Sequence, residues 1–162
     1  MAKNQEGEVL MDESEDTGSN PRVYELGFHL DPELPTEEAK KAYQTIRELI
    51  AQKGAVVAEV EPEKVQLAYT ISRQEVGHRR DFSSSYFSWI VYETTPTVHT
   101  DIIAAADAEK RIFRFIDLVT TKDAARHALE VHELLAKVPE PEDAPEDVLS
   151  TEIDAALESV TL

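Results

Sequence analysis

The residue types that usually carry catalysis are scattered along this sequence. Cysteine is absent, which excludes disulfides, thiolate zinc sites and cysteine nucleophiles. His127 and His132 stand five residues apart, whereas two metal ligands on one helical face stand four apart, so we expect ordinary surface histidines. His78 and Asp81 lie near a run of serines at 83–85, but no Gly-x-Ser-x-Gly elbow exposes one of them as a nucleophile.

The motifs of nucleotide-dependent enzymes are missing as well. The sequence has neither a Gly-x-Gly-x-x-Gly fingerprint nor a Walker loop, and its five glycines offer little for a phosphate cradle. The acid pairs Glu37-Glu38 and Glu142-Asp143 suit a helix start and a solvated linker better than acid–base catalysis. We therefore predict a binding protein that is not an enzyme and needs no cofactor or metal.

Basic side chains form a more informative pattern. One group lies in a polar stretch before the third predicted strand and the other beside the fourth strand: Arg73, His78, Arg79 and Arg80, then Lys110, Arg111 and Arg114. In the first group, Glu75 and Asp81 are the only acids close by in the sequence. Because arginine binds phosphate through two parallel hydrogen bonds, these groups predict an RNA-binding surface, and a merely solubilising surface is the alternative.

The net charge of −17 lies mainly towards the two ends of the chain. Residues 1–21 carry −5, residues 22–122 carry −3 and residues 123–162 carry −9, so the middle is nearly balanced and leaves room for a basic face. No stretch approaches the run of about 18 apolar residues that spans a membrane. We expect a cytoplasmic protein without a membrane segment.

Periodicity predicts two elements at the start of the central region. Between Arg22 and Leu30 apolar residues alternate with polar ones, which is typical of a half-buried strand. A helix follows, with Thr36 as its cap, apolar residues at helical spacing through Ile50, and Gly54 as a left-handed residue at its end.

The next segments predict three strands and a second helix. A long edge strand runs from 55 to 71 with a bend at Pro62, the polar segment 72–85 forms an extended hairpin loop, and a strand covers 86–92. A weaker helix begins at Pro96, and a strand covers 111–119. The order β-α-β-β-α-β predicts an α+β, ferredoxin-like fold with a four-stranded antiparallel sheet, order 4-1-3-2, and two helices on one face.

Composition divides the chain into three parts. Residues 1–21 lack apolar periodicity and are predicted to be a disordered acidic arm, residues 22–122 form the domain, and residues 123–162 form an acidic tail with short helices. Asp123 is a candidate cap for the first tail helix. The second face of the sheet is predicted to be open, as in many platforms for RNA or protein.

Several short motifs, in order and at the right spacing, resemble the bacterial small-subunit ribosomal protein S six family. They are Tyr24-Glu25, Leu30-Asp31-Pro32-Glu33-Leu34, Gly54-Ala55, Leu67-Ala68-Tyr69-Thr70-Ile71 and Ile112-Phe113-Arg114-Phe115. The sequence departs from the family where Val65 and Gln66 replace basic residues, where Thr70 replaces proline, and in its longer hairpin loop.

This resemblance implies a structural protein that binds the central domain of small-subunit ribosomal RNA beside ribosomal protein S eighteen, in the cytoplasm, without catalysis or cofactor. Arg114 corresponds to a basic residue of a family motif, and Arg22 to the basic position before Tyr24-Glu25. The other candidate RNA-binding residues, Arg73, Arg79, Arg80, Lys110 and Arg111, rest on charge alone. The alternative is a ferredoxin-like protein-interaction or ligand-sensing module.

Overall fold

The computed structural model describes residues 19–139. The elements in this part of the chain are β1 (Arg22–Leu30), α1 (Thr36–Lys53), β2 (Ala55–Glu75), β3 (His78–Thr94), α2 (Pro96–Ala108), β4 (Ile112–Thr120) and α3 (Lys122–Lys137). Most of the arm predicted for residues 1–21, and the predicted tail beyond residue 139, lie outside the described residues. None of the helices within residues 19–139 is long and apolar enough to cross a membrane.

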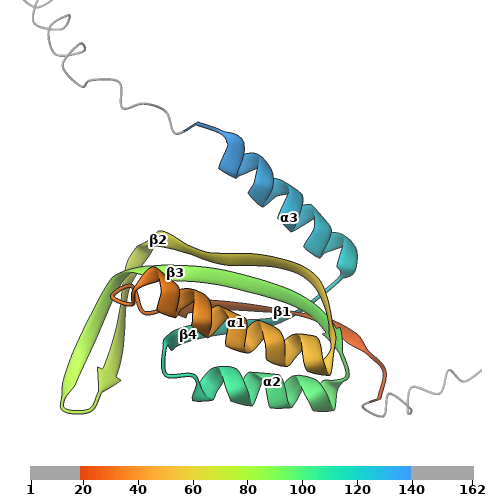
Figure 1. Cartoon of the computed structure of the whole chain (residues 1–162), viewed down its shortest axis with the longest axis horizontal. Coiled ribbons are helices and arrows are strands. Elements are labelled where there is room, and N and C mark those ends of the chain that lie inside the picture. Colours follow the sequence, from red (N-terminus) through yellow and green to blue (C-terminus); the bar gives the residue numbers. More distant parts are fainter. Residues whose placement is uncertain (1–18, 140–162) are drawn as a thin grey trace, which may run out of the picture. The chain divides into compact units, whose positions relative to one another are not determined.

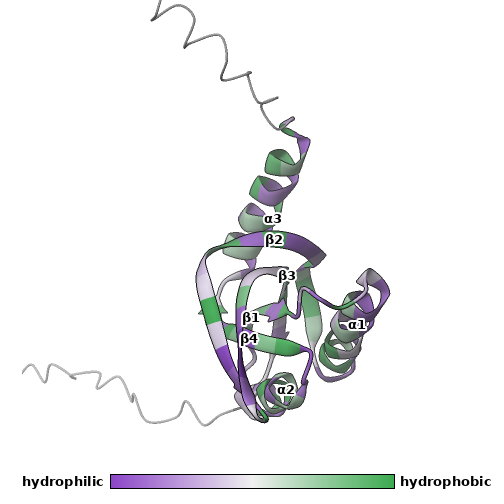
Figure 2. Cartoon of the chain, turned by 90° about the vertical axis from the view of Figure 1, so that its left-hand side faces the viewer, coloured by the Kyte–Doolittle hydropathy of each residue, from purple (hydrophilic) through white to green (hydrophobic). Residues whose placement is uncertain are grey.

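The four strands form one antiparallel sheet in the order β2-β3-β1-β4 (Figure 1). This is the predicted order 4-1-3-2 seen from the opposite edge, and the prediction of a four-stranded antiparallel α+β sheet is confirmed. The long strand β2 lies at the edge, and its colours alternate between hydrophilic and hydrophobic along its length (Figure 2). β1 is a central strand because it pairs with β3 on one side and with β4 on the other.

The core lies between one face of this sheet and the helices α1 and α2. Every second residue of β1 is buried on that face, and Ile46 of α1 and Ile102 of α2 pack against the same cluster, which also contains Tyr24, Leu26, Phe28, Leu30, Ala42, Ile50, Ile90 and Tyr92. The strand period of two and the helix period of 3.6 thus meet in a single apolar layer. Both helices therefore cover the same face.

Hydrogen bonds at the rim tie each helix to the sheet. Arg47 of α1 donates to both carboxylate oxygens of Glu59 on β2, at 2.6 and 2.8 Å. His99 of α2 lies between Tyr92 Oη, 2.9 Å from its Nδ1, and Asp117 Oδ2, 2.8 Å from its Nε2. Burial raises the pKa of the Tyr92 hydroxyl, so this hydroxyl stays protonated. These bonds fix the rotation of both helices on the sheet.

Residues 72–85, which were predicted to form an extended loop, instead form a two-stranded ribbon at the tip of the hairpin between β2 and β3. The two strands remain paired from Ser72↔Asp81 to Glu75↔His78, and only Val76 and Gly77 connect them. Gly77 has a φ of +83°, a left-handed conformation that glycine adopts without strain. Polar residues do not reveal such a ribbon in the sequence, because a ribbon exposed on both faces needs no apolar alternation.

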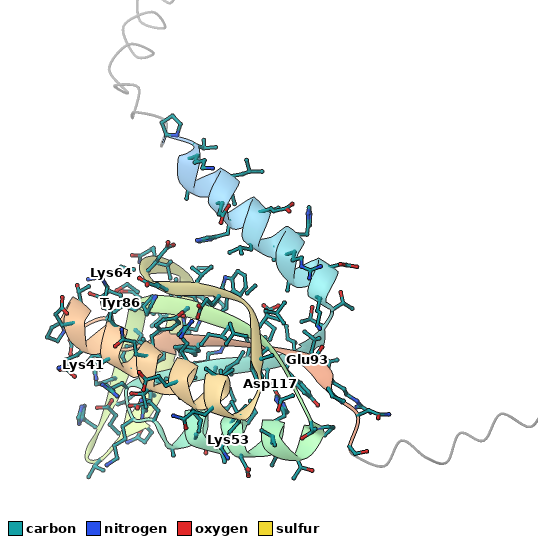
Figure 3. The ribbon with its side chains drawn as sticks, turned by 45° about the vertical axis from the view of Figure 1, so that its right-hand side comes forward. Lys41, Lys53, Lys64, Tyr86, Glu93 and Asp117 are labelled. Carbon is teal, nitrogen blue, oxygen red and sulfur yellow. The ribbon has the colours of Figure 1, made fainter. Side chains whose placement is uncertain are left out.

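The expected ends of α1 differ from the structure. Thr36 is the first helical residue and caps nothing with its side chain, while Pro35 occupies the cap position. The hydroxyl of Thr36 lies 3.5 Å from Tyr86 Oη. Tyr86 itself faces Lys64 across the β2–β3 pair (Figure 3). Gly54 is extended, with a φ of −159°, and not left-handed. A side chain there would meet the carbonyl oxygen of Glu93 at 2.6 Å, so close packing requires this glycine.

The second face of the sheet is partly covered by the first turns of α3. Ala125 is buried and Leu129 packs with it against Ala58, Val91 and their neighbours Val23, Val57 and Trp89. The hydroxyl of Thr121 accepts a hydrogen bond from the amide of Ala124 at 3.2 Å, so the cap is Thr121 and not the expected Asp123. The compact unit that contains the sheet extends to Leu129.

The helical phase of α1 predicts a contrast between two neighbouring substitutions. Ile46→Ala removes a side chain that is 2% exposed in the core, and we expect the free energy of unfolding to fall by about 2–5 kcal/mol. Gln44→Ala changes an exposed residue and should alter it by less than about 0.5 kcal/mol. Urea denaturation measures both values, and equal effects would contradict the assignment of the buried face.

Candidate nucleic-acid interface

The seven basic candidates occupy three places in the fold. Arg22 begins β1, the arginines of the hairpin lie on paired strands, and the others lie at or just before β4. Arg73 and Arg80 are directly opposite each other in the register. Arg79 follows on the exposed ribbon, with its side chain 67% exposed. A strand, and not a loop, therefore orients each hairpin arginine.

Arg80 is held by three carboxylates. It donates to Asp31 at 2.8 and 3.1 Å, to Glu33 at 2.9 Å and to Glu75 at 3.3 Å, and its guanidinium lies 4.7 Å from the Phe82 ring centroid. Burial alone would raise the pKa of Asp31, but the hydrogen bonds from Arg80 and from the Glu33 amide outweigh it and hold that pKa below its ordinary value. Arg80 thus fastens the ribbon to the segment between β1 and α1. Of the two acids that lie close by in the sequence, Glu75 is one of these partners, whereas Asp31 and Glu33 are distant in sequence and were not predicted.

Arg111 is engaged in a similar way. Its Nε and Nη2 donate to the two carboxylate oxygens of Glu109 at 2.9 and 3.1 Å, and Glu38 of α1 lies 3.5 Å away. The hydrogen bond from Arg111 lowers the pKa of the Glu109 carboxyl, although burial opposes this. A bidentate pair of this kind links the start of β4 to the end of α2.

Three other cations remain outside such pairs. In the described part of the chain, no ion pair joins Arg73, Lys110 or Arg114 to a carboxylate. Arg73 donates to the backbone carbonyl of Lys110 at 3.3 Å, and Arg73 and Arg114 line one shallow hollow that also includes Asp107. Their charges therefore gather around the beginning of β4, where an anionic ligand can approach them.

Arg114 belongs to a small group of residues on the second face of the sheet. Its Nη1 donates to Tyr69 Oη at 2.6 Å, and its guanidinium lies 5.8 Å from the Tyr69 ring centroid. His29 is opposite Arg114 in the register and its Nδ1 lies 2.7 Å from the Ser85 hydroxyl. Burial, and then the positive charge of Arg114, lower the pKa of His29, so this imidazole is neutral at pH 7.

Sequence reasoning did not identify Tyr69, His29 and Ser85 as members of this site. They come from three strands, and only the register of the sheet brings them near Arg114. The motif around Tyr69 was the one available signal, and it pointed to a family and not to a contact. Within residues 19–139 no group of three or more histidine and acidic side chains is arranged to hold a metal ion.

Comparison with known proteins identifies the family. A family model described as Ribosomal protein S6 matches residues 23–118, which is more than half of the chain. The chain belongs to the ribosomal protein S6 family. It is therefore a structural, non-enzymatic ribosomal protein. Membership of this family confirms the expectation of a cytoplasmic protein of the small ribosomal subunit.

Two curated relatives are similar to this S6-family chain. The small ribosomal subunit protein bS6 of Porphyromonas gingivalis is 27% identical over 122 residues, which cover 75% of this chain and 97% of the relative. The bS6 protein of Campylobacter curvus is 33% identical over 96 residues, which cover 59% of this chain and 62% of the relative. A crystal structure of 30S ribosomal protein S6 from Thermotoga maritima aligns with a TM-score of 0.49 and 18% identity, over 74% of this chain and 100% of that one.

The carboxylates around Arg80 predict a pH-dependent contribution to stability in this S6-family protein. Arg80→Ala leaves the carboxylate of Asp31 without its arginine partner, and we expect the free energy of unfolding to fall by about 1–3 kcal/mol at neutral pH. Because the pKa of Asp31 in the folded state lies below 3.8, this stabilisation is present above about pH 4 and is lost as the pH falls through the folded-state pKa.

Urea denaturation of wild type and Arg80→Ala at about pH 7 and about pH 3 measures this effect. Arg79→Ala is the matched control, since its exposed side chain should contribute less than about 0.5 kcal/mol at either pH. An Arg80→Ala penalty of the same size at both pH values would show that Asp31 does not carry it.

Proposed function

We propose that this protein is a structural component of the small ribosomal subunit that binds the central domain of its ribosomal RNA, beside ribosomal protein S eighteen. The observation that carries the proposal is the group of Arg73, Lys110 and Arg114, three cations around the start of β4 that form no ion pair with a carboxylate among the described residues. Phosphate is the natural partner of such a group, because each contact releases a counterion from the RNA.

The seven candidate residues then have different roles. Arg73, Lys110 and Arg114 contact phosphates, and the exposed Arg79 on the ribbon extends this contact. Arg22 is also exposed but lies at the opposite end of the sheet, where Val23 pairs with Thr120 at the end of β4, so it contacts a different stretch of the RNA. Arg80 and Arg111 mainly hold the fold, because their guanidinium groups already donate to carboxylates. The proposed neighbour S eighteen and the proposed division into acidic arm, domain and acidic tail rest on the family resemblance and on composition.

The acidic ends of the chain support selectivity in this proposal. Residues 1–21 carry −5 and residues 123–162 carry −9, and negative charge repels the phosphates of any RNA. A site of matched shape and charge can offset that repulsion, whereas a random contact with RNA cannot. The ends therefore disfavour arbitrary RNA more than they disfavour the proposed ribosomal site.

The proposal predicts the salt dependence of RNA binding. Replacing Arg73, Lys110 and Arg114 together by Ala should weaken binding to small-subunit ribosomal RNA and reduce the slope of log affinity against log salt by about 2–3 units. Filter binding over a series of salt concentrations measures affinity and slope together. The thermal unfolding of the variant should remain close to that of wild type, since none of the three side chains is buried.

A control with the same change in net charge separates local contact from overall charge. Replacing Lys40, Lys41 and Lys53 by Ala also removes three positive charges, but these charges lie on α1, where Figure 3 labels Lys41 and Lys53. This control should leave the slope within about one unit of wild type. If both triple variants changed the slope equally, binding would depend on net charge and not on the proposed surface.

Sedimentation tests the assembly itself. A ribosomal subunit protein should co-sediment with small subunits in a sucrose gradient and remain there at moderate salt. The alternative function, a protein-interaction or ligand-sensing module, should instead give a discrete oligomer in isolation and no ribosomal peak. Immunodetection of the full chain across the gradient distinguishes these outcomes.

A further inference from the structure

A groove on the second face of the sheet lies beside the proposed phosphate-binding group. It has a volume of about 360 Å³, and its walls include His29, Leu67, Tyr69, Phe87, Arg114 and Ile116. The first turns of α3 cover a different part of this face, around Ala58 and Val91. The groove is thus an open apolar surface next to exposed positive charge.

A bulge in β2 creates the groove. The register passes from Gln66↔Ser84 directly to Ile71↔Phe82, so that the residues from Leu67 to Thr70 face only Ser83. Extra residues of this kind bend a strand and re-aim its side chains. Tyr69, although it belongs to the far edge strand, reaches over the sheet to bond with Arg114 of β4.

A glycine keeps the floor of this region low. A side chain at Gly27 would lie 3.2 Å from Ile116 Cγ2 and 3.5 Å from the Phe87 ring, which are two groove-lining side chains. Ile116 is 54% exposed and Tyr69 is 62% exposed. The groove therefore presents a flat apolar floor and an aromatic wall to solvent.

The charge around the groove selects the chemistry of its occupant. In the described structure none of its lining residues is acidic, while Arg114 supplies an exposed positive charge and Arg73 lies in the adjoining hollow. An occupant that combines a flat apolar group with a neighbouring negative charge suits these walls. A nucleotide has both, since its base is planar and its phosphate is anionic.

Polar groups in the groove can contact the edge of a base. The side-chain amide of Gln66 donates to the Ser83 carbonyl at 2.9 Å, which leaves its own carbonyl oxygen to accept a hydrogen bond. Backbone groups between Leu67 and Thr70 lie opposite the single residue Ser83 and have no register partner of their own on β3. Such groups discriminate among bases that are not paired within a duplex.

We infer that this groove binds one unstacked base of a single-stranded RNA segment, with the base against Tyr69 and Phe87 and its phosphate on Arg114. The inference rests on the proposed RNA-binding function and deepens it, because it identifies the RNA as single-stranded at this point. Tyr69 is then both a stacking surface and the group that orients the Arg114 guanidinium.

Substitutions at Tyr69 test the inference with the full chain and a short single-stranded RNA that carries one 2-aminopurine. Tyr69→Ala should weaken binding of this RNA by about 5- to 150-fold, the range expected when one base loses its stacking partner. Tyr69→Phe, which keeps the ring and loses the hydroxyl, should weaken it less. Neither variant should change the salt slope or the affinity for a duplex RNA of the same length, because no charge is lost.

A matched control and the fluorescence readout complete the experiment. Leu118→Ala removes an exposed apolar side chain of β4 that does not line the groove, and it should leave affinity unchanged. The 2-aminopurine emission should change on binding to wild type and not on binding to Tyr69→Ala.

Two outcomes would overturn the inference while leaving RNA binding by the arginines intact. One is equal loss of single-stranded and duplex binding in Tyr69→Ala. The other is that binding of the single-stranded RNA does not depend on Tyr69, whereas binding of an acidic peptide with aromatic residues does. That result would make the groove a protein site. A salt slope unchanged in the Arg73, Lys110 and Arg114 triple variant would instead overturn the proposed function itself.

Discussion

The burial of one face of β1 is the constraint on which the rest of the structure depends. Tyr24, Leu26, Phe28 and Leu30 are all buried against the helices, and β1 is paired on both sides. Because side chains alternate along a strand, the residues between them must lie on the second face. The pairing then transmits this choice to both neighbours, placing Phe87 and Arg114 opposite His29. A slip of one residue would turn Arg114 towards the helices and abolish the site.

Ion pairing decides which arginines are available to a ligand. Arg80 and Arg111 are each surrounded by carboxylates from other segments, and their hydrogen bonds connect the ribbon and β4 to the rest of the domain. A phosphate would have to displace those carboxylates, at the expense of leaving partly buried acids unpaired. Arg114 requires no such exchange, since it donates to the hydroxyl of Tyr69 and not to a carboxylate. The geometry therefore divides a chemically uniform set of residues into structural and ligand-binding ones.

The second face of the sheet shows how one surface can be both protected and functional. Near Ala58 and Val91 it is covered by Ala125 and Leu129 of α3, which removes an apolar patch from water. Near β4 it stays open, and the bulge in β2 converts the flat surface into a groove. The open part adjoins the cations at the start of β4. An apolar groove and a phosphate-binding group thus form one continuous surface, which suits a ligand that carries both kinds of group.

The order of the elements, the buried face of β1 and the buried stripe of α1 could all be predicted from the sequence, because each follows from local periodicity. The sequence also determined that catalytic and metal-binding motifs are missing from the chain, and its motifs pointed to the correct family. The length of the ribbon between Ser72 and Ser85 depends on the tertiary structure, since an exposed ribbon has no apolar pattern. The cap of α1 and the conformation of the glycine at its end depend on it too. The tertiary structure also decided the partners of Arg80 and Tyr69. Asp31 is 49 residues from Arg80, and Arg114 is 45 residues from Tyr69, and contacts between such distant residues depend on strand register, which local spacing cannot encode.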